Sequence, residues 1–185
     1  MDRRALIQLL AEAEVVRTGN FTLKSGATSP VYIDLRRLVG YPNVLREVAS
    51  AYADRASKLK FDVLAALPYA ALPIGTALSL DMERPLVYPR KERKDYGTAK
   101  QVEGVFEEGQ RALVIDDVIT DGGAKLEGIE ALEGAGLVVQ DILVLVDREA
   151  GGRETLAERG YRLHTILTLA EILDAMGVAA GQPAS

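Results

Sequence analysis

A run of apolar residues that ends at two adjacent carboxylates is the part of the sequence best suited to chemistry. Asp116 and Asp117 follow the apolar run Ala112–Ile115, and Gly122 and Gly123 come shortly afterwards, where a helical pattern begins. Glycines let a backbone turn tightly near a ligand, and a helix N-terminus directs unpaired N–H groups toward an anion. Carboxylates can accept hydrogen bonds from sugar hydroxyls or help to hold hydrated Mg²⁺. The segment therefore indicates a sugar-phosphate site, although the same residues could form only a strand end and a turn.

Alternating strands and helices are expected to position this loop. Short apolar runs alternate with helical patterns along the chain, at Val63–Leu67, Leu86–Tyr88, Ala112–Ile115, Ile142–Val146 and Leu163–Leu167. Such alternation predicts βαβ units and a mostly parallel sheet. Because the runs are apolar on consecutive positions, we expect helices on both faces of the sheet. The acidic loop would then lie at the carboxyl edge of the sheet, where ligands of open α/β folds bind.

Capping residues and apolar spacing predict further helices near both ends of the chain. Asp2 is a good cap residue before an amphipathic stretch, and another helix is expected after Pro42. Thr168 begins a segment with the spacing of a capping box, which predicts a last helix. We predict one domain over residues 1–176 and a flexible tail over 177–185.

Composition and charge narrow the classes of protein. The chain of 185 residues has no cysteine, which excludes disulfides and cysteine nucleophiles. Its formal net charge of −5 argues against nucleic-acid binding, because that function needs an extended basic surface. The uncharged stretch Val63–Leu80 approaches the length of a membrane span, but Pro68, Pro73 and Gly75 interrupt it. With no signal-peptide pattern, we expect a cytoplasmic protein without membrane or nucleic-acid partners.

The acidic loop closely resembles the phosphoribosyl pyrophosphate motif of the type I phosphoribosyltransferases. The resemblance implies their α/β fold, which has a mostly parallel central sheet with helices on both faces and a small N-terminal hood. It also implies that phosphoribosyl pyrophosphate is bound by Asp116, Asp117, Val118, Ile119, Thr120, Asp121, Gly122, Gly123 and Ala124. Asp121 adds a negative charge where the family commonly has a small or hydroxyl residue, and Ala124 lacks a hydroxyl often found there. Phosphate binding would therefore depend more on backbone amides.

The segment Phe21–Arg36 resembles the N-terminal signature of the orotate phosphoribosyltransferases within this family. The resemblance implies that Lys24 contacts substrate and that Tyr32 and Ile33 line the base pocket. A lysine offers a point charge to a carboxylate-bearing pyrimidine, and an aromatic face can pack on its ring. The same residues also fit a hairpin that turns at residues 24–26.

A later segment, Val146–Gly152, resembles the aspartate–arginine pair at the end of a late strand in the same enzymes. The resemblance implies that Arg148 binds the orotate carboxylate, a task that suits a planar bidentate donor. The resemblance also implies that Thr120 contacts orotate. Arg148 could also form an ordinary salt bridge at the strand end.

The basic segment Tyr88–Gly97 resembles the mobile catalytic loop of these enzymes, and Pro68–Pro73 resembles their pyrophosphate loop. By this resemblance, the residues that contact the pyrophosphate are Arg90, Lys91, Lys94, Tyr96 and Tyr69. Lys94 is the first candidate for catalysis, with Arg90 and Lys91 assisting, because cations stabilise the charge that gathers on the leaving pyrophosphate. In the family this loop reaches the neighbouring subunit, which implies a homodimer with shared active sites. Such a charge run could otherwise be a solvated loop.

The predicted reaction transfers ribose 5-phosphate to orotate, giving orotidine 5′-monophosphate and pyrophosphate in pyrimidine biosynthesis. Mg²⁺ is the expected cofactor, held by Asp116 and Asp117 directly or through water or substrate. Two alternatives stay open: a phosphoribosyltransferase for purines or other bases, and a nucleotide-sensing RNA-binding regulator on the same fold. His164, the single histidine, is expected to pack or to bond to backbone instead of taking part in catalysis.

Overall fold

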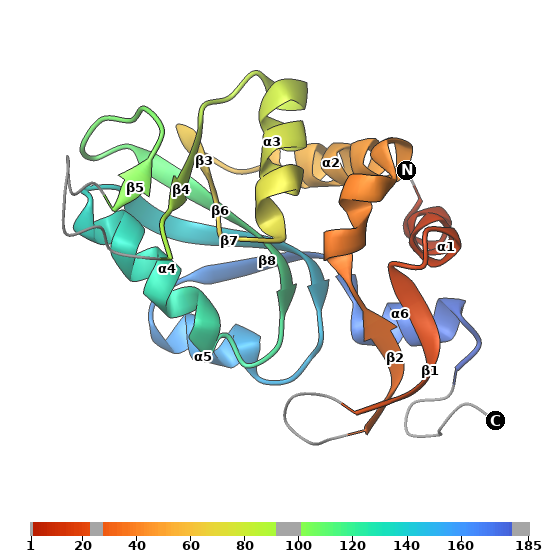
Figure 1. Ribbon diagram of the computed structural model, residues 1–185. Coiled ribbons are helices and arrows are strands. Elements are labelled where there is room, and N and C mark those ends of the chain that lie inside the picture. The colour runs from red at the N-terminus through yellow and green to blue at the C-terminus, as the bar shows by residue number, and fades with distance from the viewer. Residues whose placement is uncertain (1, 23–27, 92–100, 179–185) are drawn as a thin grey trace.

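A six-stranded sheet forms the centre of the computed structural model, which describes residues 2–22, 28–91 and 101–178 (Figure 1). The strands lie in the order β5-β4-β3-β6-β7-β8. All neighbours from β4 to β8 are parallel, and β5 is antiparallel to β4. This confirms the predicted mostly parallel sheet. The strands are β3 Val63–Ala66, β4 Leu86–Pro89, β5 Val102–Glu103, β6 Arg111–Ile119, β7 Val138–Asp147 and β8 Arg162–Thr168.

Helices cover both faces of this sheet, as predicted. One face carries α2 (Pro42–Ala56) and α3 (Ala71–Met82), and the other carries α4 (Gly123–Gly134) and α5 (Gly152–Glu158) (Figure 1). Along β6, Leu113 and Ile115 pack on the side of α2 and α3, whereas Ala112 and Val114 pack on the side of α4 and α5. Consecutive positions of the strand are therefore buried on opposite faces, which explains its uninterrupted apolar run.

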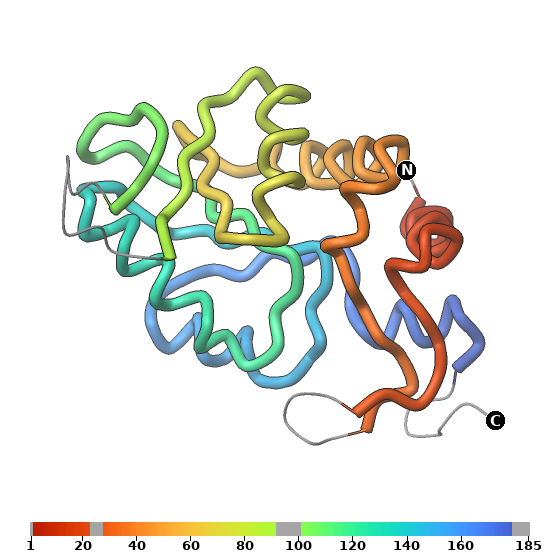
Figure 2. The backbone as a smooth tube through the Cα atoms, viewed as in Figure 1, coloured from red at the N-terminus to blue at the C-terminus, as the bar shows by residue number. Residues whose placement is uncertain are grey.

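A second, two-stranded sheet lies beside the central one and forms a hood with the first and last helices (Figure 2). Its strands are antiparallel, as expected for the predicted hairpin. The first helix and the last helix lie together on this side, and Arg3 of the first forms an ion pair with Glu171 of the last. The elements of the hood are α1 Arg3–Glu12, β1 Val16–Thr22, β2 Thr28–Ile33, η1 Leu35–Gly40 and α6 Leu169–Ala175.

The capping predictions at the two ends have different outcomes. The capping box at Thr168 is confirmed, since its side chain accepts from the N–H of Glu171 at 3.2 Å and the Glu171 carboxylate accepts from the N–H of Thr168 at 2.8 Å. Asp2 occupies the N-cap position of α1, but its exposed side chain makes no capping hydrogen bond, so that part of the prediction is wrong. The backbone carbonyl of Asp2 accepts a hydrogen bond from the N–H of Leu6 at 3.1 Å.

The uncharged stretch Val63–Leu80 forms β3 and most of α3, separated by a turn that contains Pro68, as predicted. Pro73 and Gly75 lie inside α3 and do not interrupt it. Within the three described ranges, every helix is too short or too polar to cross a membrane. The predicted tail lies outside the described residues from position 179 onward.

Candidate active site

The two adjacent acids lie near the carboxyl end of β6, in the middle of the sheet. The strand continues past its apolar run as far as Ile119, because the parallel pairing with β7 extends to Asp147. Asp116 is 4% exposed, whereas the side chain of Asp117 is 25% exposed. The buried hydroxyl of Tyr52, on α2, donates to the backbone carbonyl of Asp116 at 2.6 Å. The tip of the strand is thus fixed by a helix beneath it.

Lys125 is a member of this site that sequence reasoning missed. Its ammonium group contacts the Asp116 carboxylate and lies 4.0 Å from Asp117 Oδ1. Burial raises the pKa of Asp116 to about 7, the Lys125 charge opposes that rise, and the charge of Asp117 adds to it. One feature could have indicated a special role for Lys125. It is a cation in the first turn of a helix, where it opposes the helix dipole.

The predicted phosphate turn follows β6 and leads directly into α4. Gly122 is the N-cap of that helix at a φ of 83°, a left-handed conformation that favours glycine. The turn packs closely against the start of α5. A Cβ added to Gly152 would lie only 2.6 Å from the carbonyl oxygen of Thr120. The Asp121 carboxylate accepts from the N–H of Gly123 at 3.1 Å. The residue noted as a departure from the family therefore engages one of the amides expected to bind phosphate.

Arg148 lies between the sheet edge and the hood. Its N–H donates to the carbonyl of Ile119 at 2.9 Å, which extends the pairing of β6 with β7 by one step. Its guanidinium Nη2 lies 3.4 Å from the buried hydroxyl of Ser29 on β2. Burial lowers the pKa of Arg148. The structure thus brings together Arg148 and the hairpin expected to form the base pocket, and it adds Ser29, which the sequence did not single out.

Tyr32 and Ile33, the hairpin residues expected to line the base pocket, have different surroundings. The ring of Tyr32 lies 5.4 Å from the ring of Phe21, and the guanidinium of Arg17 lies 5.3 Å from the centre of the Tyr32 ring. This aromatic and cationic cluster belongs entirely to the hairpin. Ile33 is half-buried and packs against the hydrophobic core.

A cavity of about 340 Å³ lies between α4 and the end of β4, and two of the residues assigned to pyrophosphate binding line it. Arg90 and Lys91 line it together with Ala124. The Arg90 guanidinium pairs with Glu103 at 2.5 Å, and the Lys91 ammonium lies 4.5 Å from the centre of the Tyr69 ring. Both cations are therefore at the expected edge of the sheet, and each already has a partner there.

Three candidate residues, Lys24, Lys94 and Tyr96, lie outside the described part of the chain.

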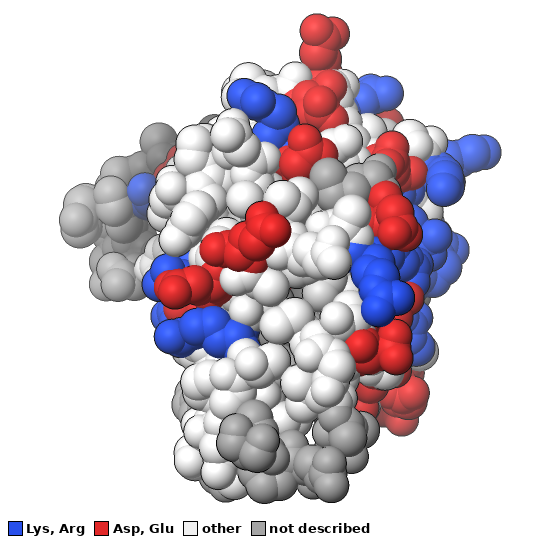
Figure 3. All heavy atoms as spheres, turned by 90° about the vertical axis from the view of Figure 1, so that its right-hand side faces the viewer, with Lys and Arg blue, Asp and Glu red and all other residues white. Residues whose placement is uncertain are grey.

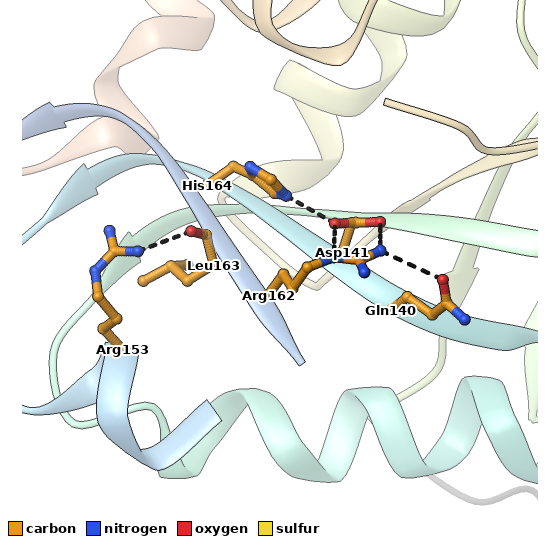
Figure 4. Close-up of polar contacts among 6 residues, drawn as sticks. All are labelled: Gln140, Asp141, Arg153, Arg162, Leu163 and His164. Carbon is orange, nitrogen blue, oxygen red and sulfur yellow. Dashed lines mark hydrogen bonds and ion pairs between the residues drawn. The ribbon is translucent and has the colours of Figure 1, made fainter. Parts of the chain in front are cut away.

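His164 lies on β8, toward the start of the strand and away from the acidic loop. Its Nε2 is 2.7 Å from Asp141 Oδ1, and Arg162 donates to both oxygens of the same carboxylate, at 2.9 and 2.8 Å (Figure 4). The expected backbone hydrogen bond was wrong, because the partner is the carboxylate of Asp141 on the neighbouring strand, which is buried and needs donors.

These features define the class of protein. The acidic loop at the carboxyl edge of a mostly parallel sheet is that of a phosphoribosyltransferase, and the family model described as "Phosphoribosyl transferase domain" matches residues 37–163. The orotate phosphoribosyltransferase of Pyrococcus furiosus is 37% identical over 179 residues, covering 96% of this chain and 98% of that protein. The chain belongs to the orotate phosphoribosyltransferase family.

A solved structure and a longer relative agree with this assignment. The crystal structure of orotate phosphoribosyltransferase from Aeropyrum pernix matches with a TM-score of 0.85 and 37% identity, covering 95% of this chain and 99% of that one. Uridine 5'-monophosphate synthase of Bos taurus is 43% identical over 171 residues, which are 91% of this chain. The chain spans 36% of that protein and 35% of the bifunctional enzyme PyrF/PyrE of Nostoc, about a third of each.

Proposed function

We propose that this chain transfers ribose 5-phosphate from phosphoribosyl pyrophosphate to orotate, releasing orotidine 5′-monophosphate and pyrophosphate in pyrimidine biosynthesis. The observation that carries the proposal is the position of Arg148. A partly buried guanidinium lies between the hood hairpin and the β6–β7 edge that carries the paired acids. A planar cation next to a sugar-phosphate site is suited to an acceptor base that bears a carboxylate.

Each part of the site has a role in this reaction. Asp116 and Asp117 would accept hydrogen bonds from the ribose hydroxyls, and the amides of the turn before α4 would bind the 5-phosphate. As pyrophosphate departs, negative charge gathers on it, and Arg90 and Lys91 lie at the edge where cations would stabilise that charge. A strong base is not required, because the acceptor nitrogen of orotate can enter already deprotonated.

Mg²⁺ is the proposed cofactor, and the residues present fit it only in part. In the described ranges, no group of three or more histidine, aspartate or glutamate side chains is placed to hold a metal. Asp116 Oδ2 touches Lys125 but has no donor in hydrogen-bond geometry, and Asp117 is partly open to solvent. Mg²⁺ commonly binds one or two carboxylates together with substrate phosphates. These two acids would hold it with oxygens of the substrate, and it would neutralise charge on the pyrophosphate.

A homodimer with shared active sites is proposed on the resemblance of the basic segment after β4 to the family's catalytic loop. Sedimentation of the purified protein at micromolar concentration tests this assembly. We expect a sedimenting mass equal to two chains. A protein that is monomeric at the concentration of the assay and still turns over orotate would contradict the shared site.

The acceptor is tested by following the ultraviolet absorbance of orotate in the presence of phosphoribosyl pyrophosphate and Mg²⁺. We expect turnover of orotate and none of hypoxanthine or adenine. Arg148→Met should raise the KM for orotate about 10- to 100-fold, because it removes a charge-assisted contact, and should leave the KM for phosphoribosyl pyrophosphate nearly unchanged. Arg159→Met, which removes an exposed arginine from the end of α5, is the control. Turnover of hypoxanthine without turnover of orotate would refute the acceptor assignment.

The alternative of an RNA-binding regulator predicts a broad basic face. On the face shown in Figure 3, acidic and basic side chains are interspersed around an uncharged area. The net charge of −5 favours the enzyme, and this face is not broadly basic.

A further inference from the structure

Lys125 occupies a position that is unfavourable for its helix. It lies in the first turn of α4, which contains no acidic residue, and a cation there opposes the helix dipole. Its side chain is only 15% exposed, so the charge is also largely removed from water. Both costs must be offset by a specific partner, and among the described residues its ammonium group pairs only with the carboxylates of Asp116 and Asp117.

A nearby positive charge stabilises the acid pair, just as the acids stabilise the charge of Lys125. Asp116 is 4% exposed, and two neighbouring carboxylates repel each other when both are charged. Among the described residues, Lys125 is the only cationic side chain paired with either acid. The free protein therefore already supplies a positive charge at the place where the proposed substrate brings its hydroxyls and its bound cation.

We propose that Lys125 is the resident counter-ion of Asp116 and Asp117, which keeps free divalent cations off this carboxylate pair. A divalent cation would then be accepted only together with the phosphate oxygens of the substrate, which add the ligands that the pair lacks. The identity of that substrate rests on the proposed function. The exclusion of free cations is a property of the protein alone and can be measured without turnover.

A purely structural ion pair makes a different prediction. If Lys125 only anchored α4, replacing it would lower the stability of the fold and leave the affinity for free metal unchanged. If Lys125 is the counter-ion, its removal exposes two carboxylates with no compensating charge, and a divalent cation takes the place of the ammonium group.

The test measures binding of Mn²⁺ to the free protein by electron paramagnetic resonance, without phosphoribosyl pyrophosphate or orotate. Lys125→Met should bind Mn²⁺ about tenfold more tightly than the parent, because one unit of opposing charge has been removed beside the carboxylates. Lys125→Arg, which keeps the charge, should match the parent. Lys58→Met changes the net charge equally at an exposed position after α2 and should also match the parent.

Equal Mn²⁺ affinity in Lys125→Met and the parent would overturn the inference, and so would equal tightening in Lys58→Met. If Lys125→Met fails to fold by circular dichroism, Lys125→Gln keeps a polar side chain at the helix start and carries the same expectation. Tighter Mn²⁺ binding in Lys125→Met, together with a parent protein that does not turn over orotate, would support the counter-ion role while refuting the proposed acceptor.

Discussion

Removing the hydroxyl of Tyr52 tests whether the tip of β6 is fixed from beneath. Tyr52 is fully buried, and its hydroxyl donates to the carbonyl of Asp116 at 2.6 Å. In Tyr52→Phe the ring stays in place, so no large cavity forms. Only the polar contact to the strand that carries the paired acids is lost.

The expected loss of stability follows from the hydrogen bond between Tyr52 and Asp116. A hydrogen bond between neutral groups contributes about 1 kcal/mol, and a buried polar group left without its donor costs about 1–3 kcal/mol. We therefore expect Tyr52→Phe to lower the free energy of unfolding by about 1–3 kcal/mol. For a chain of this size, each kcal/mol lowers Tm by about 2–4 °C. Because Asp116 can then shift, the KM for phosphoribosyl pyrophosphate should also rise, by about three- to tenfold.

Urea unfolding followed by circular dichroism gives the stability, and initial rates at varied phosphoribosyl pyrophosphate give the KM. The matched control is Tyr161→Phe, whose hydroxyl donates to Glu133 Oε2 at 3.0 Å at an exposed site. That change should cost about 0.5 kcal/mol or less and leave the KM unaltered. The reasoning is refuted if Tyr52→Phe is as stable as Tyr161→Phe and has the KM of the parent.

Three further changes test other parts of the structure. Gly152→Ala should raise the KM for phosphoribosyl pyrophosphate and destabilise the fold by about 1–3 kcal/mol in urea unfolding, because the new Cβ would lie 2.6 Å from the Thr120 carbonyl. Asp121→Ser should lower that KM about three- to tenfold in steady-state kinetics, since it frees the Gly123 amide and removes a charge near the phosphate. The hydrogen bonds from Arg162 lower the pKa of Asp141 below its ordinary 3.8, so this carboxylate stabilises the fold above that pH and the contribution is lost as pH falls through the lower folded value. Asp141→Asn should therefore unfold at lower urea than the parent at pH 7, with the difference shrinking below about pH 4.

Features set by local pattern could be predicted from the sequence. The parallel sheet follows from consecutive apolar residues, the last helix follows from its capping box, and the phosphate turn follows from its glycines. The assignment of Arg148 to the orotate site came from resemblance to a family and not from periodicity. Its position beside the hood agrees with that assignment, and kinetics must test the role.

Features set by distant contacts could not be predicted in this way. Tyr52 and Asp116 are 64 positions apart, and Ser29 and Arg148 are 119 apart, so no local pattern links either pair. The partner of His164 was missed for the same reason, because Asp141 lies on another strand. Lys125 is close to the acids in sequence, yet whether it faces them or solvent depends on how α4 packs.

The connection between β7 and α5 limits how this enzyme could be redesigned for another base. It runs from Arg148 to Gly151 and leads into Gly152, the first residue of α5, whose backbone touches the turn before α4. Asp147 accepts from the N–H of Glu149 at 2.8 Å, and the Glu149 carboxylate accepts from the N–H of Ala170 at 2.9 Å, so the segment is braced from within and from α6. Inserting residues here to enlarge the proposed base site would displace the turn before α4 as well. Engineering of base preference should therefore exchange side chains or alter the β1–β2 hairpin, and keep the length of this connection.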